Sequence, residues 1–344
     1  MIQYKIKKFQ YLDPNIDVIE MKNEDIEVHV STLGCTILSI FTKDKNEVKS
    51  DIVLGFDDRN IYLKQDKYIG AIVGRVAGRI KDATFTLNEQ EYHLEKNNGE
   101  NALHGGLQGF DKQIFNYEMI DQGICLHYLS KDLEAGYPGN MEVSISYTLV
   151  ENKLIAHYEA TCDQDSIVNI TNHTYFNLAG RGTVLNHELL IHSDEILCSD
   201  ETGCANGVRL KVKDTPFDFN TSKQIGRDID MDHEQLKIGG GYDHYYIFNQ
   251  TSPYIILKDK ESGRVMKVNS DQKGAQIYSA NFLDGTLKGK NNWYFNKRDA
   301  ICIETQSAPN AIHIEENPST ILRKGNKYSA TTIFEFYIES EEVL

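Results

Sequence analysis

Two residues far apart in the chain carry side chains that can exchange protons near neutral pH. His173 lies in the segment TNHTYFNLAG, beside two asparagines, two aromatic rings and two hydroxyl side chains. Glu304 lies in ICIETQSAPNAIH, where Ile301 and Ile303 alternate with Cys302 and predict a strand that ends near the glutamate. An isolated carboxylate beside an apolar strand is costly to bury unless it is paired or functional. The plain alternatives are a hydrogen-bonded core histidine and an exposed glutamate at the end of a strand.

Three further polar side chains lie in glycine-containing segments. His104 is in NNGENALHGG, where glycines on both sides let the backbone approach a ligand closely. Arg79 is in GAIVGRVAGRI, and its planar guanidinium can donate several hydrogen bonds to hydroxyl groups. Asp243 is in GGGYDHYYIF, at the start of an expected strand, and can accept two hydroxyl hydrogen bonds. The alternatives are an exposed turn histidine, a surface charge and an Asx turn.

The sequence argues against several other kinds of chemistry. His187 and His192 are five residues apart, so they fall on opposite faces of a strand and diverge on a helix. There is no Cys/His quartet for a structural metal, no GxSxG elbow and no dinucleotide fingerprint. The glycine triplet at 239–241 lacks the strand–GxxxxGK[ST]–helix context of a phosphate loop. We therefore expect neither a metal ion nor a nucleotide cofactor.

Composition and charge are ordinary for a soluble protein and fit a neutral substrate more easily than a polyanion. The chain has 344 residues and a formal net charge of −15, which repels nucleic acids and anionic membrane surfaces. Six cysteines are scattered without a CxxC pair, as expected for reduced thiols in the cytoplasm. The N-terminal segment MIQYKIKKFQ has no apolar run typical of a secretory signal, and no window is apolar enough to span a bilayer.

Period-2 alternation dominates the chain and predicts antiparallel strands. Segments 141–150 and 154–160 form one expected hairpin, residues 84–95 a second and residues 254–268 a third, and residues 329–339 form a closing strand. The strand patterns also contain three histidines, which we interpret as structural: His93, His127 and His157. Helical periodicity is scarce, with one short helix expected over 227–238, ended by the glycine triplet. The pattern favours one large, mostly antiparallel β domain over residues 1–344, with two or more packed sheets.

Considered in order along the chain, these segments resemble the aldose 1-epimerase (galactose mutarotase) family nearly from end to end. The segments that carry the resemblance are VSTLGCTILSI, GRVAGRI, ENALHGG, AGYPGN, TNHTYFNLAG, YDHYYIF, YSANFL and IETQSAPNAIH. The resemblance implies an all-β fold, a large antiparallel β-sandwich of the galactose mutarotase-like supersandwich type with few short helices. It also implies an open, concave active-site face.

The resemblance implies an isomerase that interconverts the α and β anomers of free hexoses such as galactose and glucose. His173 corresponds to the family's general acid and Glu304 to its general base. The residues that correspond to substrate-binding positions are Arg79, His104, Asp243 and Phe282. The implied partner is a small monosaccharide, without a cofactor, a metal, a nucleic acid or a membrane, and the protein is expected as a monomer or homodimer.

Some positions depart from the family pattern, and three other functions stay open on the sequence. Gly78 stands where many members have asparagine, SAPNAIH follows ETQ in place of a PD-containing segment, and YDH replaces the commoner FDH. A hexose-6-phosphate 1-epimerase on the same fold would need a cationic pocket. A glycosidase would use Asp243 and Glu304 as paired carboxylates. A non-catalytic carbohydrate-binding or sensor protein would need no acid and base.

Overall fold

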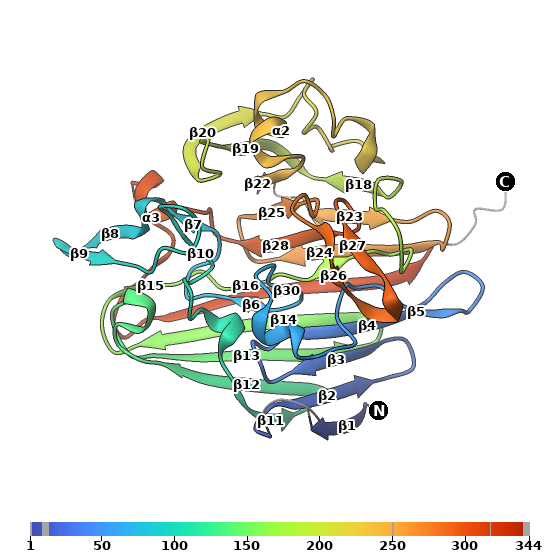
Figure 1. Ribbon diagram of the computed structural model, residues 1–344, viewed down its shortest axis with the longest axis horizontal. Coiled ribbons are helices and arrows are strands. Elements are labelled where there is room, and N and C mark those ends of the chain that lie inside the picture. The colour runs from blue at the N-terminus through green and yellow to red at the C-terminus, as the bar shows by residue number, and fades with distance from the viewer. Residues whose placement is uncertain (1, 9–13, 250, 317, 340–344) are drawn as a thin grey trace.

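Antiparallel strands make up most of the described molecule, and its largest sheets have nine, six and five strands (Figure 1). The computed structural model describes residues 2–8, 14–249, 251–316 and 318–339. The α-helices in these residues are short: α1 (Ile61–Lys64), α2 (Glu234–Gly239) and α3 (Ala311–Ile314). The 3-10 turns are Lys81–Ala83, Phe110–Lys112, Glu134–Gly136, Ile225–Arg227 and Lys290–Asn292. The expected all-β class is therefore confirmed.

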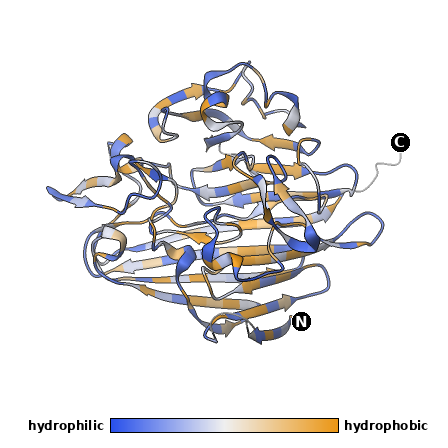
Figure 2. Ribbon diagram, in the orientation of Figure 1, coloured by the Kyte–Doolittle hydropathy of each residue, from blue (hydrophilic) through white to orange (hydrophobic). Residues whose placement is uncertain are grey.

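The nine-stranded sheet contains all or most of three segments that the sequence predicts as strands or hairpins. Its order is β11 (Asn116–Ile120), β12 (Gly123–Ser130), β13 (Met141–Val150), β14 (Lys153–Cys162), β30 (Lys327–Ile338), β24 (Arg264–Ser270), β23 (Ile255–Lys258), β18 (Glu188–Ile191) and β21 (Lys223–Gln224). The β13–β14 and β23–β24 hairpins and the closing strand β30 are confirmed. Hydrophobic and hydrophilic residues alternate along these strands (Figure 2).

The six-stranded sheet carries one wall of the functional site. Its order is β17 (Tyr175–Phe176), β28 (Ile301–Gln306), β25 (Gly274–Tyr278), β22 (Asp243–Phe248), β19 (Ser193–Ser199) and β20 (Ala205–Lys211). The five-stranded sheet runs in chain order through β1 (Gln3–Lys8), β2 (Asp17–Lys22), β3 (Glu27–Ser31), β4 (Ile37–Lys43) and β5 (Lys49–Asp51).

Five short two-stranded ribbons complete the strands of the described residues. They are β7 (Arg79–Ile80) with β10 (Ala102–Leu103), β6 (Ile72–Val73) with β16 (Thr171–Asn172), β15 (Ser166–Ile167) with β29 (Ile321–Leu322), β26 (Asp284–Lys288) with β27 (Tyr294–Asn296), and β8 (Thr84–Leu87) with β9 (Gln90–His93). The β8–β9 ribbon confirms the expected hairpin at 84–95, with Phe85 opposite Tyr92.

One hydrophobic cluster joins the inner faces of all three large sheets. It includes Val28 from β3, Ile145 from β13, Ile303 from β28 and Phe334 from β30, each no more than 2% exposed. None of the helices in the described parts of the chain has the length and apolar character that a bilayer-spanning helix needs.

The expected helix over 227–238 is wrong in its extent. Only Glu234–Gly239 is α-helical, because the His233 ring accepts the Gln235 N–H at 3.2 Å and starts the helix there. The glycine stop is confirmed, since Gly240 adopts the left-handed conformation at φ 65° and caps the C-terminus.

The expected end of the strand at Glu304 is also wrong. β28 continues to Gln306 as an interior strand between β17 and β25, and all six of its residues are buried. Ile301 and Ile303 face the main core as expected, while Cys302 belongs to a second hydrophobic cluster. Glu304 is therefore a mid-strand carboxylate in a buried sheet, and the exposed alternative is excluded.

Candidate active site

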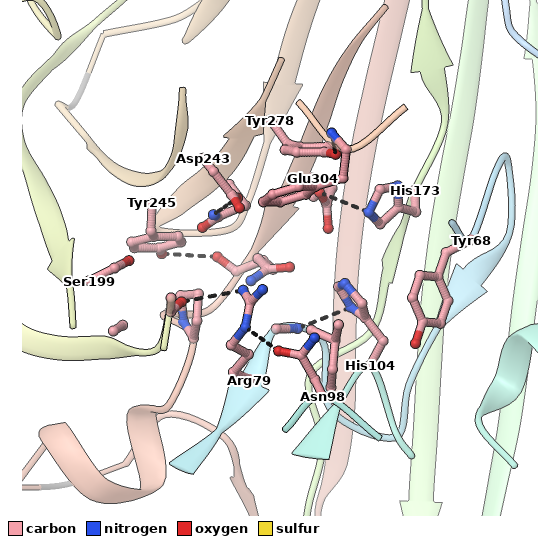
Figure 3. A pocket seen from close by; sticks show the side chains of 18 of the residues that line it. Tyr68, Arg79, Asn98, His104, His173, Ser199, Asp243, Tyr245, Tyr278 and Glu304 are labelled. Carbon is pink, nitrogen blue, oxygen red and sulfur yellow. Dashed lines mark hydrogen bonds and ion pairs between the residues drawn. The ribbon is translucent and has the colours of Figure 1, made fainter. Parts of the chain in front are cut away.

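A pocket of about 390 Å³ opens on one face of the six-stranded sheet, and all six residues singled out in the sequence line it. They are Arg79, His104, His173, Asp243, Phe282 and Glu304. Figure 3 shows Asp243, Tyr278 and Glu304 on one side of the pocket and Arg79, Asn98 and His104 on the other. Segments separated by more than 200 positions thus meet at a single cavity.

The strand register of the six-stranded sheet brings the carboxylates of Glu304 and Asp243 to the same side of the pocket. Gln276 of β25 lies directly opposite Glu304 of β28, and Tyr245 of β22 lies opposite Gln276. Asp243 is two residues from Tyr245 and so shares its face of the sheet. The Gln276 amide donates a 2.7 Å hydrogen bond to Asp243 Oδ1, which fixes the orientation of this carboxylate.

Backbone hydrogen bonds hold His173 at the other side of Glu304. His173 lies between β16 and β17, where its N–H donates to Ala71 O at 2.8 Å and its carbonyl accepts from Gly70 N at 3.0 Å. Its ring stacks on Tyr175, with the two ring centroids 5.0 Å apart. His173 Nε2 then lies 3.5 Å from Glu304 Oε1, and the two side chains are only 6% and 3% exposed.

Burial dominates the electrostatics of this pair. It raises the pKa of Glu304 well above its ordinary value, with Asp243 adding to the rise and Arg79 opposing it. Burial also lowers the pKa of His173 to about 4. Both shifts disfavour an isolated charge, whereas the close contact favours imidazolium and carboxylate together. In either distribution the pair holds one proton, which an acid–base exchange requires.

The loop that carries His104 is tightly constrained and fixes the histidine tautomer. His104 has φ 53°, and a Cβ on the following Gly105 would come within 1.8 Å of Gly74 O. His104 Nδ1 accepts the Gly78 N–H at 3.2 Å. Burial, His173 and Arg79 together lower the pKa of His104 well below its ordinary value, so the ring is neutral and its proton is on Nε2.

Because of this tautomer, His104 is a poor metal ligand, although it belongs to a cluster of three possible ligands. His104, His173 and Glu304 offer ligand atoms within 4.8 Å of one another. A metal-bound histidine must present a lone pair, but the only lone pair of His104 is directed at the Gly78 N–H, which cannot act as an acceptor. His104 Nε2 is therefore suited to donating a hydrogen bond to a hydroxyl group.

Arg79 is held in place by uncharged hydrogen-bond partners. Because these partners do not neutralise the guanidinium, its positive charge acts on the groups of the pocket. Its Nε donates to Asn98 Oδ1 at 2.8 Å and its Nη1 to Gly203 O at 3.3 Å. Burial raises the pKa of both Asp243 and Glu304, and the nearby guanidinium of Arg79 partly offsets these rises. Gly78, just before it, has φ 77°, and a Cβ there would lie 2.8 Å from Pro309.

Sequence reasoning missed several residues of the pocket. Tyr68, with its ring centroid 4.7 Å from that of His104 and a φ of 54°, lies in a loop without a motif. Tyr278, on which Phe282 stacks at 5.9 Å, and Gln276 look like ordinary strand residues in the sequence. Gln306 is fully buried, and both polar atoms of its amide lack a partner among the described residues. It lies two residues after Glu304 on the same strand, so its place on the same face could have been predicted from the sequence.

The chain also matches a known protein family. The family model described as aldose 1-epimerase matches residues 17–335. The chain belongs to the aldose 1-epimerase family. Membership in this family makes it an isomerase that acts on carbohydrates.

Curated relatives of this aldose 1-epimerase family member match nearly the whole chain. It is 38% identical to galactose mutarotase of Sus scrofa over an alignment of 334 positions that covers 94% of this chain and 94% of that one. It is 32% identical to aldose 1-epimerase of Escherichia coli, with 92% of this chain and 94% of that one covered.

Solved structures show the same architecture. The GalM/aldose epimerase homologue from C. elegans has a TM-score of 0.88 at 30% identity, covering 94% of this chain and 99% of that one. Galactose 1-epimerase from Lactobacillus acidophilus has a TM-score of 0.89 at 26% identity, covering 99% and 100%. The expected galactose mutarotase-like fold is therefore confirmed.

Proposed function

We propose that this chain interconverts the α and β anomers of free hexoses such as galactose and glucose, with Glu304 as the base and His173 as the acid. The observation that carries the proposal is the 3.5 Å contact between His173 Nε2 and Glu304 Oε1 in a pocket large enough for a sugar ring. An acid and a base that meet in one pocket can act on the two oxygens of one hemiacetal.

The proton balance of the reaction matches the single proton of the pair. In the reactive distribution the Glu304 carboxylate takes the proton of the C1 hydroxyl while the His173 imidazolium protonates the ring oxygen O5. The C1–O5 bond breaks to give the open-chain aldehyde, which leaves Glu304 protonated and His173 neutral. After rotation about C1–C2, closure on the other face reverses both transfers. The enzyme then returns to its starting state without consuming a co-reactant.

The remaining polar residues orient the sugar. The Arg79 guanidinium, held by Asn98, donates to hydroxyl oxygens. His104 Nε2–H provides a donor of fixed direction, and Asp243, held by Gln276, accepts from hydroxyl groups. Phe282 is 51% exposed at the pocket and gives the apolar face of the sugar a surface to contact.

The charges of the pocket favour a neutral sugar over a hexose phosphate. Arg79 and Lys67 are the cations among the described lining residues, against the acidic groups Asp66, Asp243 and Glu304. Lys67 is already within 3.3 Å of Asp66. A phosphate would therefore meet a pocket without excess positive charge.

We also propose that the protein acts in the cytoplasm, as a monomer or homodimer, without nucleic acid or membrane partners. Its six cysteines are all free, as expected in a reducing compartment. The net charge of −15 opposes binding to anionic polymers and surfaces.

Polarimetry of freshly dissolved α-D-galactose tests the catalytic assignment. We expect Glu304→Gln and His173→Asn each to slow anomer exchange by at least about 100-fold, because each removes one of the two proton transfers. The matched controls Glu142→Gln and His93→Asn, on exposed positions of β13 and β9, should keep the wild-type rate. Near-normal exchange in either site variant would refute the assignment, and faster turnover of glucose 6-phosphate than of glucose would favour the phosphate-specific alternative.

A further inference from the structure

A second group of possible metal ligands lies on the outer face of the nine-stranded sheet, at its β11–β12 edge (Figure 1). Glu118 of β11 lies directly opposite Cys125 of β12, and His127 is two residues further along the same strand. Alternation places Cys125 and His127 on one face, whereas Ile124 and Leu126 point into the core and are fully buried. These three side chains therefore converge on the solvent side of the sheet.

The distances suit a small cation with tetrahedral coordination. His127 Nε2 lies 3.3 Å from Glu118 Oε1, and the ligand atoms of all three residues lie within 4.8 Å of one another. A tetrahedral Zn²⁺ ion bound by sulfur, nitrogen and oxygen needs ligand atoms roughly 3.3–3.6 Å apart. The nitrogen–oxygen separation already fits, whereas Cys125 Sγ lies 4.0 Å from His127 Nδ1 and has to move towards an ion held by Nε2.

The neighbouring strand supplies partners that orient two of the ligands. Ser144 of β13 lies opposite His127, with its Oγ 3.0 Å from His127 Nδ1. Burial raises the pKa of the Cys125 thiol, and a hydrogen bond from Ser146, which lies opposite Cys125, partly offsets this rise. Such partners fix the ring and sulfur positions of metal ligands and strengthen binding.

The tautomer rule that argues against a metal at His104 permits one at His127. Nδ1 of His104 faces a backbone N–H, which is always a donor. Nδ1 of His127 faces a hydroxyl group, which can donate or accept. When a cation binds, His127 can place its proton on Nδ1, donate it to Ser144 Oγ and present the Nε2 lone pair.

In contrast to the expectation of a structural His127 and no metal ion, we propose that Glu118, Cys125 and His127 form a zinc-binding site on the outer face of the nine-stranded sheet, separate from the sugar pocket. Thiolate, imidazole and carboxylate are the ligands that Zn²⁺ prefers, and the thiolate disfavours Mg²⁺ and Ca²⁺. Binding transfers the thiol proton of Cys125 to solvent and leaves a fourth coordination position for water. The net charge of −15 favours cation binding in general.

Calorimetric titration of the full-length protein with zinc chloride tests the site. We expect one ion to bind, and Cys125→Ser and His127→Asn each to weaken binding by at least about tenfold. Ser144→Ala should weaken it by a similar or smaller factor because it removes only the orienting hydroxyl. The matched controls Cys198→Ser, which removes another partly buried free thiol, and His93→Asn should bind zinc as the wild type does.

Cobalt substitution and polarimetry separate this site from the sugar pocket. Co²⁺ should give a thiolate-to-cobalt charge-transfer band in the wild type and in Cys198→Ser, but not in Cys125→Ser. Zinc bound at this site should leave anomer exchange unchanged. The proposal is overturned if the wild type binds no zinc, if Cys125→Ser leaves binding unchanged, or if binding is lost in His173→Asn and zinc inhibits the reaction.

Discussion

At the scale of single residues, one environment prepares the acid and the base by shifting their pKa values in opposite directions. The burial that makes a lone carboxylate unfavourable raises the pKa of Glu304, and the burial that makes a lone imidazolium unfavourable lowers the pKa of His173. The two groups lie in contact, so their protonation states are coupled, and burial disfavours the states in which one of them is charged alone. At an exposed position, their ordinary pKa values would leave both deprotonated at pH 7.

The pH dependence of kcat/KM follows from these directions. The pair gains a second proton only as the pH falls through the lowered pKa of His173, about 4, and it loses its proton only above the ordinary pKa range of Glu304. We therefore expect the rate to fall on the acid side near pH 4 rather than near 6.5, and on the alkaline side above the ordinary pKa range of a glutamate. Asp243→Asn should move the alkaline fall to lower pH, because Asp243 raises the pKa of Glu304. Stopped-flow polarimetry showing an acid limb near pH 6.5 would contradict the assignment.

At the scale of elements, the hairpins could be predicted from alternation, but their register against other strands could not. The inward positions of Val143, Ile145 and Tyr147 on β13 could be predicted from the sequence because one face of the strand is buried and the other is polar. β28 is buried on both faces, so alternation carries no such signal and the end of the strand was misplaced.

In the candidate site, too, the residues in local motifs could be predicted, and those that depend on strand pairing or loop packing could not. His173, Glu304 and the other motif residues were found because their segments carry distinctive residue types. Gln276 was missed because its importance comes from lying opposite Glu304, which depends on the pairing of β25 with β28. Tyr68 was missed because its place beside His104 depends on the folding of a loop over the pocket.

At the scale of the whole molecule, we propose that residues 1–344 form a single cooperative domain. The main hydrophobic cluster contains residues of all three large sheets, and the active site takes residues from both halves of the chain. A division into independent domains would cut both the core and the pocket.

Unfolding measurements test this proposal. We expect one transition that coincides in near-UV and far-UV circular dichroism. Leu154→Ala, at a fully buried position of β14, should lower the free energy of unfolding by about 2–5 kcal/mol and shift the whole transition. Leu129→Ala, at a position 49% exposed on β12, should change it by less than about 0.5 kcal/mol. Two separate transitions, with only one moved by Leu154→Ala, would show independent domains.

A double-variant cycle on anomer exchange tests the central claim most directly. If His173 and Glu304 pass one proton through one sugar, removing either partner already disables the exchange. We therefore expect the double variant His173→Asn/Glu304→Gln to be no more than a few fold slower than the slower single variant. Polarimetric rate losses that multiply, with the double variant slower by the product of the two single effects, would show that the residues act independently and would contradict the account.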